Sequence, residues 1–213
     1  SGVCASEIFD PTPYLAAFVR FAVRHPLTQA FPRKFKSAFT GCDDHDHVAA
    51  AIQDLTYVSQ IRVEDGVEKR GFKVFVGGGT SIMPRIAPTL YEFIPVEEYL
   101  RATEALLRVF HQSDEMRRNR MKARVKFLID RVGIDEYRAM MEEELKQSWA
   151  QRSFDPTPLL FLEDESQDAP ALSSSFSTNG HDPDFQRWVE SNVRPQKQQG
   201  YRTVTVKLPL GDI

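Results

Sequence analysis

The sequence predicts an α+β fold in which a mixed β-sheet is flanked by helices. Residues 34–40, 56–63 and 71–76 have the composition and alternation of strands, and the last two are joined by the turn Glu64-Asp65-Gly66. Apolar residues then recur at helical spacing over residues 95–111, 114–132 and 135–149. Because 41% of its 213 residues are apolar, the chain can bury at least one sizeable core.

The first helix is predicted to begin at Asp10. Aspartate is a favoured N-cap, and Pro11 is tolerated in the first turn, where its missing N–H group is not needed. Apolar residues follow at helical spacing until Pro26, which should end the helix. The phrase FDPTP occurs at residues 9–13 and again at 154–158, and we interpret it as a helix start that is used twice.

The later part of the chain indicates a change of domain. Gly133 should end the second long helix, and residues 152–183 have the Pro-, Ser- and acid-rich composition of a linker. A short helix at 185–192 and a strand at 201–208 follow, and that strand has no predicted partner. The predicted division is a domain at 1–150, a linker at 151–184 and the beginning of a further domain at 185–213.

Composition excludes several classes of protein. The net charge of −3 is too small to indicate nucleic acid or an anionic membrane as the main partner. No apolar run reaches the roughly 18 residues that span a bilayer, and the first residues lack the features of a signal peptide. Cys4 and Cys42 are the only cysteines, which fits a reducing compartment. The cytoplasm is the expected location.

Two segments carry cations in patterns that suit an anionic ligand. On a strand, Lys34 and Lys36 would share one face, where two ammonium groups could bind a small oxyanion and deliver protons. A solvated edge strand is the alternative. Residues 117–126 are mostly basic with no acidic residue. On one continuous helix, an apolar stripe beginning at Met121 would have cations on both borders, Arg124 among them. A solvated face is again the alternative, and without interleaved aromatic residues nucleic acid is not indicated.

Two further motifs are less specific. Gly77, Gly78 and Gly79 follow a predicted strand, and they would let the backbone approach a flat or phosphorylated ligand. They match neither a Walker loop nor a dinucleotide-binding turn, so a plain loop is the alternative. The phrase GCDDHDH contains His45 and His47, but its side chains are too crowded to converge on one ion, and no metal site is predicted.

Several long phrases occur in an order that resembles one enzyme family. They are PRKFKSAFTGC, HVAAAIQDL, GFKVFVGGG, YEFIP, RRNRMKARVKFLIDRVG and RPQKQQGYRTVTVKLPLGDI. Together they resemble the siroheme- and iron–sulfur-dependent sulfite and nitrite reductases. The resemblance implies an oxidoreductase of sulfur assimilation or nitrite reduction, built from two copies of a ferredoxin-like half-domain followed by a cofactor domain. This chain would be the first cofactor domain and the start of the second ferredoxin-like half, a fragment that is inactive alone.

The resemblance implies siroheme and a [4Fe-4S] cluster in the intact enzyme. The chain departs from the family's cluster pattern, because the four cysteine positions hold Cys4, Asp10, Cys42 and Asp46. Such a cluster takes four thiolates. The cluster is therefore not expected in this fragment by itself. Siroheme is not expected either, because the resemblance implies that its pocket is completed by the missing first ferredoxin-like half.

The resemblance also assigns roles to residues. Lys34 and Lys36 match a catalytic pair of lysines that faces the substrate anion, and lysine at position 36 favours sulfite over nitrite as the substrate. Residues that resemble siroheme-contacting positions are Arg33, Gly77, Gly78, Gly79 and Arg124. The implied electron donor is ferredoxin or a flavoprotein reductase, and neither nucleic acid nor a membrane is expected as a partner. The alternatives are a non-redox module that binds a tetrapyrrole or an anion, and a metal-binding protein centred on His45 and His47.

Overall fold

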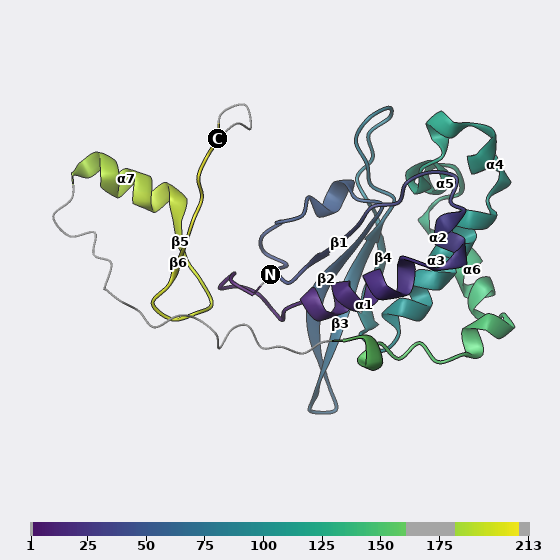
Figure 1. Cartoon of the computed structure of the whole chain (residues 1–213), viewed down its shortest axis with the longest axis horizontal. Coiled ribbons are helices and arrows are strands. Elements are labelled where there is room, and N and C mark those ends of the chain that lie inside the picture. Colours follow the sequence, from purple (N-terminus) through teal and green to yellow (C-terminus); the bar gives the residue numbers. More distant parts are fainter. Residues whose placement is uncertain (1, 161–181, 209–213) are drawn as a thin grey trace. The chain divides into compact units, whose positions relative to one another are not determined.

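The computed structural model describes residues 2–160 and 182–208. The chain forms two compact units, one of residues 8–162 and the other of residues 1–7 together with 163–213. The larger unit contains a four-stranded sheet and most of the helices (Figure 1). Among the described helices, none is long and apolar enough to cross a membrane.

The sheet of the larger unit is mixed, as predicted. Its strands are β1 (Ser37–Thr40), β2 (Leu55–Glu64), β3 (Val67–Val76) and β4 (Thr89–Pro95), in that spatial order. β1 pairs parallel with β2, whereas β2–β3 and β3–β4 are antiparallel. Strand β4 was not predicted, because Pro95 was interpreted as the start of a helix. Proline is tolerated at this end of a strand that lies at the edge of the sheet.

The β2–β3 hairpin confirms the predicted turn. Asp65 and Gly66 both adopt positive φ angles, 54° and 78°, and Glu64 pairs with Val67 across the turn. This left-handed conformation matches the twist of the two strands and is favoured by an Asp-Gly pair.

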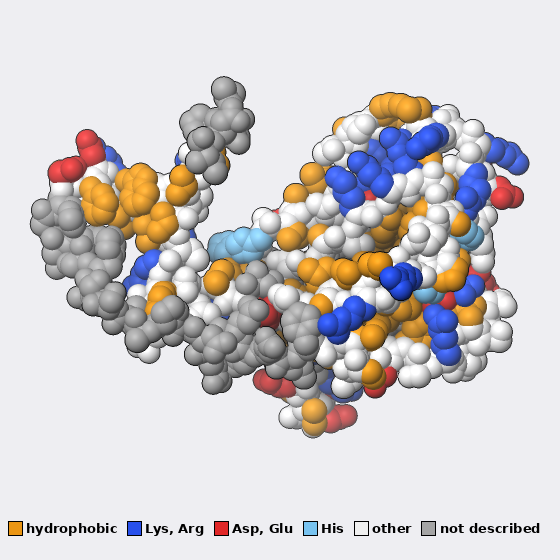
Figure 2. All heavy atoms as spheres, viewed as in Figure 1, with side chains coloured by type: hydrophobic (Ala, Val, Ile, Leu, Met, Phe, Trp, Pro, Cys, Tyr) orange, Lys and Arg blue, Asp and Glu red, His pale blue; other side chains and the backbone are white. Residues whose placement is uncertain are grey.

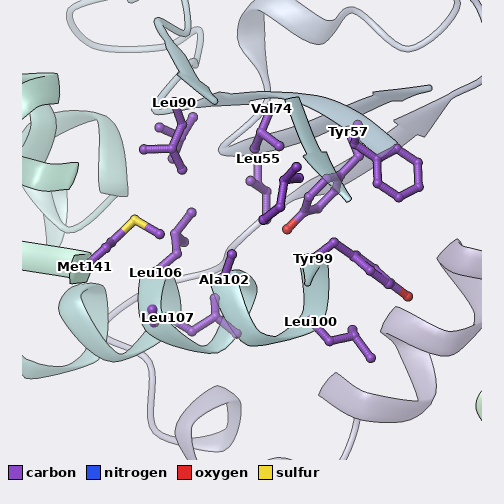
Figure 3. Close-up of a cluster of buried hydrophobic side chains, with 14 of the residues drawn as sticks. Leu55, Tyr57, Val74, Leu90, Tyr99, Leu100, Ala102, Leu106, Leu107 and Met141 are labelled. Carbon is purple, nitrogen blue, oxygen red and sulfur yellow. The ribbon is translucent and has the colours of Figure 1, made fainter. Parts of the chain in front are cut away.

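Helices cover the sheet and bury its core. In the larger unit they are α1 (Thr12–Ala22), α2 (Pro26–Gln29), α3 (Tyr99–Gln112), α4 (Asp114–Arg118), α5 (Val125–Val132) and α6 (Ile134–Leu145), with short 3-10 turns η1 (Ala50–Ile52), η2 (Arg120–Lys122), η3 (Ser148–Gln151) and η4 (Thr157–Leu159). Figure 3 shows side chains of α3 facing those of the sheet, among them Tyr99 and Leu106 opposite Leu55 and Val74. Burial of these apolar side chains is the main source of stability.

The predicted continuous helix over residues 114–132 is wrong. The structure divides it into α4, η2 and α5, with extended backbone at Asn119 (φ −132°) and Arg124 (φ −91°, ψ 150°). The side chain of Asn119 accepts a hydrogen bond from the backbone N–H of Met121 at 3.0 Å, a local contact that competes with a continuous helix. Met121 is therefore 57% exposed rather than part of an apolar stripe.

The FDPTP phrase opens a helical segment at both of its occurrences, as predicted. Asp10 accepts a hydrogen bond from the backbone N–H of Thr12 at 2.9 Å, and Asp155 accepts one from Thr157 at the same distance. These residues begin α1 and η4. The first helix ends at Ala22 rather than at Pro26, because the chain turns there and Pro26 opens α2.

Of two other predicted boundaries, one is confirmed and one shifts. Gly133, with φ 83°, does end α5. The last predicted helix of this unit ends earlier, at Leu145, and Ser148–Gln151 forms the separate turn η3.

The smaller unit contains α7 (Pro183–Asn192), β5 (Val193–Pro195) and β6 (Arg202–Val204). Asp182 caps α7 through hydrogen bonds from the next backbone N–H groups. The prediction of an unpartnered strand is wrong, because β5 and β6 form an antiparallel pair. Residues 161–181 of the predicted linker lie outside the described residues.

Candidate functional site

Lys34 and Lys36 lie just before the sheet rather than on a strand. β1 begins at Ser37, so the predicted strand of residues 34–40 is shorter at its start. The Phe35 side chain packs against the hydrophobic core, and the centroid of its ring lies 5.9 Å from that of Phe31. Both lysines are exposed. No ion pair with a carboxylate forms at either ammonium group within the part of the chain that the structure describes.

A cavity of about 610 Å³ lies beside this stretch. Its apolar wall comes from α1 and from Phe31 and Phe35, and its cationic wall comes from Arg33, Lys34 and Arg120. Lys36 does not line this cavity. The space therefore combines a hydrophobic surface with cations, which suits an amphiphilic anion.

The basic segment after α3 is tied to the stretch that carries the lysines. Arg33 donates a hydrogen bond from Nη1 to the backbone oxygen of Arg120 at 2.7 Å. Arg117 donates from Nη2 to the backbone oxygen of Ala30 at 2.9 Å. Residues far apart in sequence thus gather at one end of the larger unit, where Figure 2 shows Lys and Arg side chains around the position of α2, α4 and α5 in Figure 1.

Several of these cations have no acidic partner. In residues 2–160 and 182–208, no carboxylate lies within ion-pairing distance of the cationic groups of Arg33, Lys34, Lys36, Arg117, Arg118, Arg120 and Lys122. Like charges gathered without counter-charges repel one another, and a bound anion would relieve that repulsion.

Arg124 is placed differently from these exposed cations. Its Nε donates to Oδ1 of Asp54 at 2.8 Å, and its Nη2 donates to Oδ2. The Asp54 side chain is fully buried, and the Arg124 side chain is 14% exposed. A fork-shaped pair of this kind is strong and directional. The pair engages the side of the guanidinium group that faces the core.

Gly77, Gly78 and Gly79 pack closely against the chain itself. A Cβ atom on Gly78 would lie 2.4 Å from the backbone oxygen of Ala51, and one on Gly77 would lie 2.6 Å from Cδ1 of Ile129. The backbone N–H groups of all three glycines donate to backbone oxygens of this unit. Internal packing therefore requires glycine at positions 77 and 78, whereas Gly79 is limited only by the Lys126 side chain at 3.1 Å, and contact with a cofactor stays a prediction.

Lys126 has a structural role that was not predicted from the sequence. Its side chain is 3% exposed, and Nζ donates to the backbone oxygens of Thr80, Ile82 and Met83 at 2.8, 2.9 and 3.0 Å. Burial lowers the pKa of Lys126, and the positive charge of Arg124 lowers it further. The three hydrogen bonds use every ammonium donor and hold the loop after the glycines against α5. The signal in the sequence was a lysine between apolar core positions of a helix.

Lys126→Met is expected to lower the free energy of unfolding by about 2–4 kcal/mol, because three backbone carbonyl oxygens lose the buried ammonium group that donates to them. Urea denaturation followed by circular dichroism measures this change. Lys122→Met is the matched control, since Lys122 is exposed and should change stability by less than about 0.5 kcal/mol. Equal stability of the two variants would contradict the role assigned to Lys126.

Asp10 and Asp46, which the resemblance matches to cluster cysteines, both have local hydrogen-bond partners. Asp10 accepts hydrogen bonds from the backbone N–H and the hydroxyl group of Thr12, although the N-cap residue of α1 is Pro11, and Asp46 accepts hydrogen bonds from the backbone N–H groups of Val48 and Ala50 at 3.1 and 2.9 Å. His45 has a largely exposed side chain whose Nε2 lies 3.7 Å from Asp44. The two aspartates therefore stabilise turns.

Comparisons with known proteins identify relatives of this chain. The family model for the nitrite and sulphite reductase 4Fe-4S domain matches residues 1–149. "Sulfite reductase [ferredoxin] 1" from Mycolicibacterium paratuberculosis is 33% identical over 144 residues, which cover 68% of this chain and 25% of that protein. "Ferredoxin--nitrite reductase" from Synechococcus elongatus is 28% identical over 226 residues, which cover 99% of this chain and 36% of that protein.

A solved structure agrees with these matches. The NirA protein of Mycobacterium tuberculosis aligns with a TM-score of 0.60 and 32% sequence identity, over 72% of this chain and 26% of that one. The chain thus spans about a quarter to a third of the length of these relatives. Since the family model covers well over half of its residues, the chain belongs to the nitrite and sulphite reductase 4Fe-4S domain family.

Proposed function

We propose that this chain supplies the cationic, substrate-facing side of a reductase that depends on siroheme and a [4Fe-4S] cluster. The reaction is the six-electron reduction of sulfite to sulfide, or of nitrite to ammonia. The proposal is carried by one observation: cations that have no acidic partner among residues 2–160 and 182–208 gather beside a cavity in a chain of this family. Electrons would come from ferredoxin, as the names of the relatives indicate for those proteins, or from a flavoprotein.

The residues present suit the anionic edge of siroheme. Siroheme carries carboxylates around its ring, and guanidinium groups such as that of Arg33 bind carboxylates well. Arg33 and the backbone at Gly77 to Gly79 are proposed to contact siroheme. Arg124 would bind a siroheme carboxylate through the edge of its guanidinium group that Asp54 does not engage. When bound, the cofactors would pass electrons from the external donor to the substrate.

This chain has too few cysteines to bind a [4Fe-4S] cluster by itself. Its two cysteines fall short of the four thiolates that a [4Fe-4S] cluster takes. We therefore propose that any cluster is held by other residues of the intact reductase. The fragment is proposed to be inactive alone.

The proposed work of Lys34 and Lys36 is electrostatic. Fixed ammonium groups would neutralise the oxyanion, orient it, and attract it more strongly as negative charge develops. They would also donate protons to the oxygen atoms that leave as water. Both lysines are exposed and no described carboxylate pairs with them, so they are available for both tasks.

Lys36→Asn is expected to raise the ratio of nitrite to sulfite turnover. Sulfite is a dianion above its second pKa, so it loses more than the monoanion nitrite when one cation is removed. A change of about tenfold in the ratio of kcat/KM values is expected, which corresponds to about 1.4 kcal/mol. Steady-state rates of the cofactor-loaded reductase on both anions measure it, and Lys69→Asn at the tip of the β2–β3 hairpin is the control. An unchanged ratio would remove position 36 from substrate selection.

The optical spectrum and the rates of the intact protein test the function itself. A siroheme spectrum with turnover of sulfite or nitrite is the expected result. The low number of cysteines also fits a module that binds a tetrapyrrole or an anion without redox chemistry. Binding of siroheme with no turnover of either anion would favour that alternative.

A further inference from the structure

Asp54 connects the segments that carry the candidate site. Asp54 lies directly before β2 and is fully buried. Its carboxylate accepts hydrogen bonds from the two guanidinium nitrogens of Arg124 and from the backbone N–H of Lys36. Its backbone oxygen accepts a hydrogen bond from the N–H of Gly77 at 2.9 Å. One residue thus contacts the lysine stretch, the glycine run and the start of α5.

The backbone of Lys36 is held on both sides by this neighbourhood. Its N–H donates to Oδ2 of Asp54 at 2.8 Å, and its carbonyl oxygen accepts from the N–H of Leu55 at 3.1 Å. These two contacts fix the peptide planes on either side of Cα. The direction in which the Lys36 side chain leaves the backbone is therefore determined by residues 54 and 55.

A buried carboxylate at this position requires an explanation, because an unpaired buried charge is strongly unfavourable. Arg124 provides the counter-charge and holds both oxygens in one orientation, so that Oδ2 remains aimed at the N–H of Lys36. An apolar residue at position 54 would leave that N–H without this acceptor. The Asp54–Arg124 pair thus orients the backbone of Lys36, which an apolar residue at position 54 could not do.

We propose that Asp54 is a positioning residue of the reductase, which acts on the substrate through Lys36. Asp54 is too deeply buried to reach a substrate anion itself. It holds the backbone of Lys36 so that the ammonium group is presented in one direction, and Arg124 keeps the Asp54 carboxylate in place. This inference rests on the proposed function, in which Lys36 faces the anion.

Hydrogen exchange in the 213-residue chain tests the backbone contact without cofactors. Asp54→Asn loses the negative charge and puts an NH2 group in place of one oxygen, so that either Nε of Arg124 or the donors at Oδ2, Nη2 of Arg124 and the N–H of Lys36, lose an acceptor. The amide of Lys36 is expected to exchange about tenfold faster or more. Arg124→Lys is a milder variant that keeps the charge but loses the fork, and a smaller increase is expected. Lys36 exchange at the wild-type rate in both variants would overturn the proposal.

Glu104→Gln is the matched control for this experiment. Glu104 is also a fully buried carboxylate that binds arginines, Arg108 and Arg152, but it contacts none of the site segments. After correction for the change in global stability, the amide of Lys36 in the Glu104→Gln variant should exchange at the wild-type rate. If the Lys36 amide exchanged as fast in Glu104→Gln as in Asp54→Asn, the faster exchange would reflect a general loss of stability. That result would contradict a positioning role for Asp54.

A double-mutant cycle in the cofactor-loaded reductase tests the consequence for the substrate. Asp54→Asn should lower kcat/KM for sulfite by on the order of 10²-fold, since a misplacement of about 1 Å has effects of that size. In a Lys36→Met background the same substitution should have little further effect, because the group it positions is gone. Additive effects would contradict the inference while leaving the proposed function intact. Wild-type kinetics of Lys36→Met alone would instead contradict the proposed function of Lys36.

Discussion

Lys34→Met or Lys36→Met in the cofactor-loaded reductase is expected to lower kcat/KM for sulfite by about 10²-fold or more. Methionine keeps a flexible, unbranched side chain but removes the positive charge. Both lysines are exposed, and none of the described carboxylates pairs with them, so the substitutions should not disturb an internal ion pair. Steady-state kinetics measure the effect, and the optical spectrum reports whether siroheme remains bound.

The control for these variants is Lys69→Met. Lys69 is also exposed, but it pairs with Glu64 on the β2–β3 hairpin and has no proposed role. Its substitution should leave turnover unchanged. If Lys34→Met and Lys36→Met both behave like this control, the lysines do not act on the substrate.

Glu104→Gln is expected to lower the free energy of unfolding by about 2–3 kcal/mol, because a buried carboxylate loses its charge-assisted hydrogen bonds to partly exposed arginines. Glu104 is fully buried, and its carboxylate binds Arg108 and Arg152, with His25 at 3.4 Å. Glutamine fills the same volume but leaves these groups without a counter-charge. Urea denaturation of the 213-residue chain measures the change.

Glu98→Gln provides the comparison for that experiment. Glu98 pairs with Arg101 one turn along the same helical segment, but both side chains are substantially exposed. Exposed pairs contribute about 0–1 kcal/mol. A loss of stability at Glu104 no larger than at Glu98 would show that the buried network is unimportant.

Local sequence signals predicted the parts of the fold that depend on neighbouring residues. The hairpin followed from strand alternation and the pair Asp65-Gly66, and the end of α5 followed from Gly133. Strand β4 was missed because its pairing with β3 is a long-range contact and Pro95 suggested a helix start. The break at Asn119 was missed because helical periodicity continues through it, while the side chain hydrogen bond that interrupts the helix leaves no periodic pattern.

The candidate site could be predicted only in part, for the same reason. The lysines at positions 34 and 36 stand out in the sequence because two cations flank Phe35. Asp54 does not stand out, since its role depends on Arg124, which is distant in the sequence and reaches it only in the folded chain. Lys126 was grouped with the other basic residues, but the fold buries it and points it at backbone oxygens. A sequence shows which residues are charged, but the partner of each charged group is determined by the fold.

A crystal structure of the cofactor-loaded reductase with bound sulfite tests the central claim most directly. The account predicts that Nζ of Lys34 and Nζ of Lys36 each lie about 2.7–3.0 Å from an oxygen of the bound anion. It also predicts that the N–H of Lys36 still donates to Asp54, as it does here at 2.8 Å. Side chains of Lys34 and Lys36 that point away from the anion, toward solvent or into ion pairs, would contradict it.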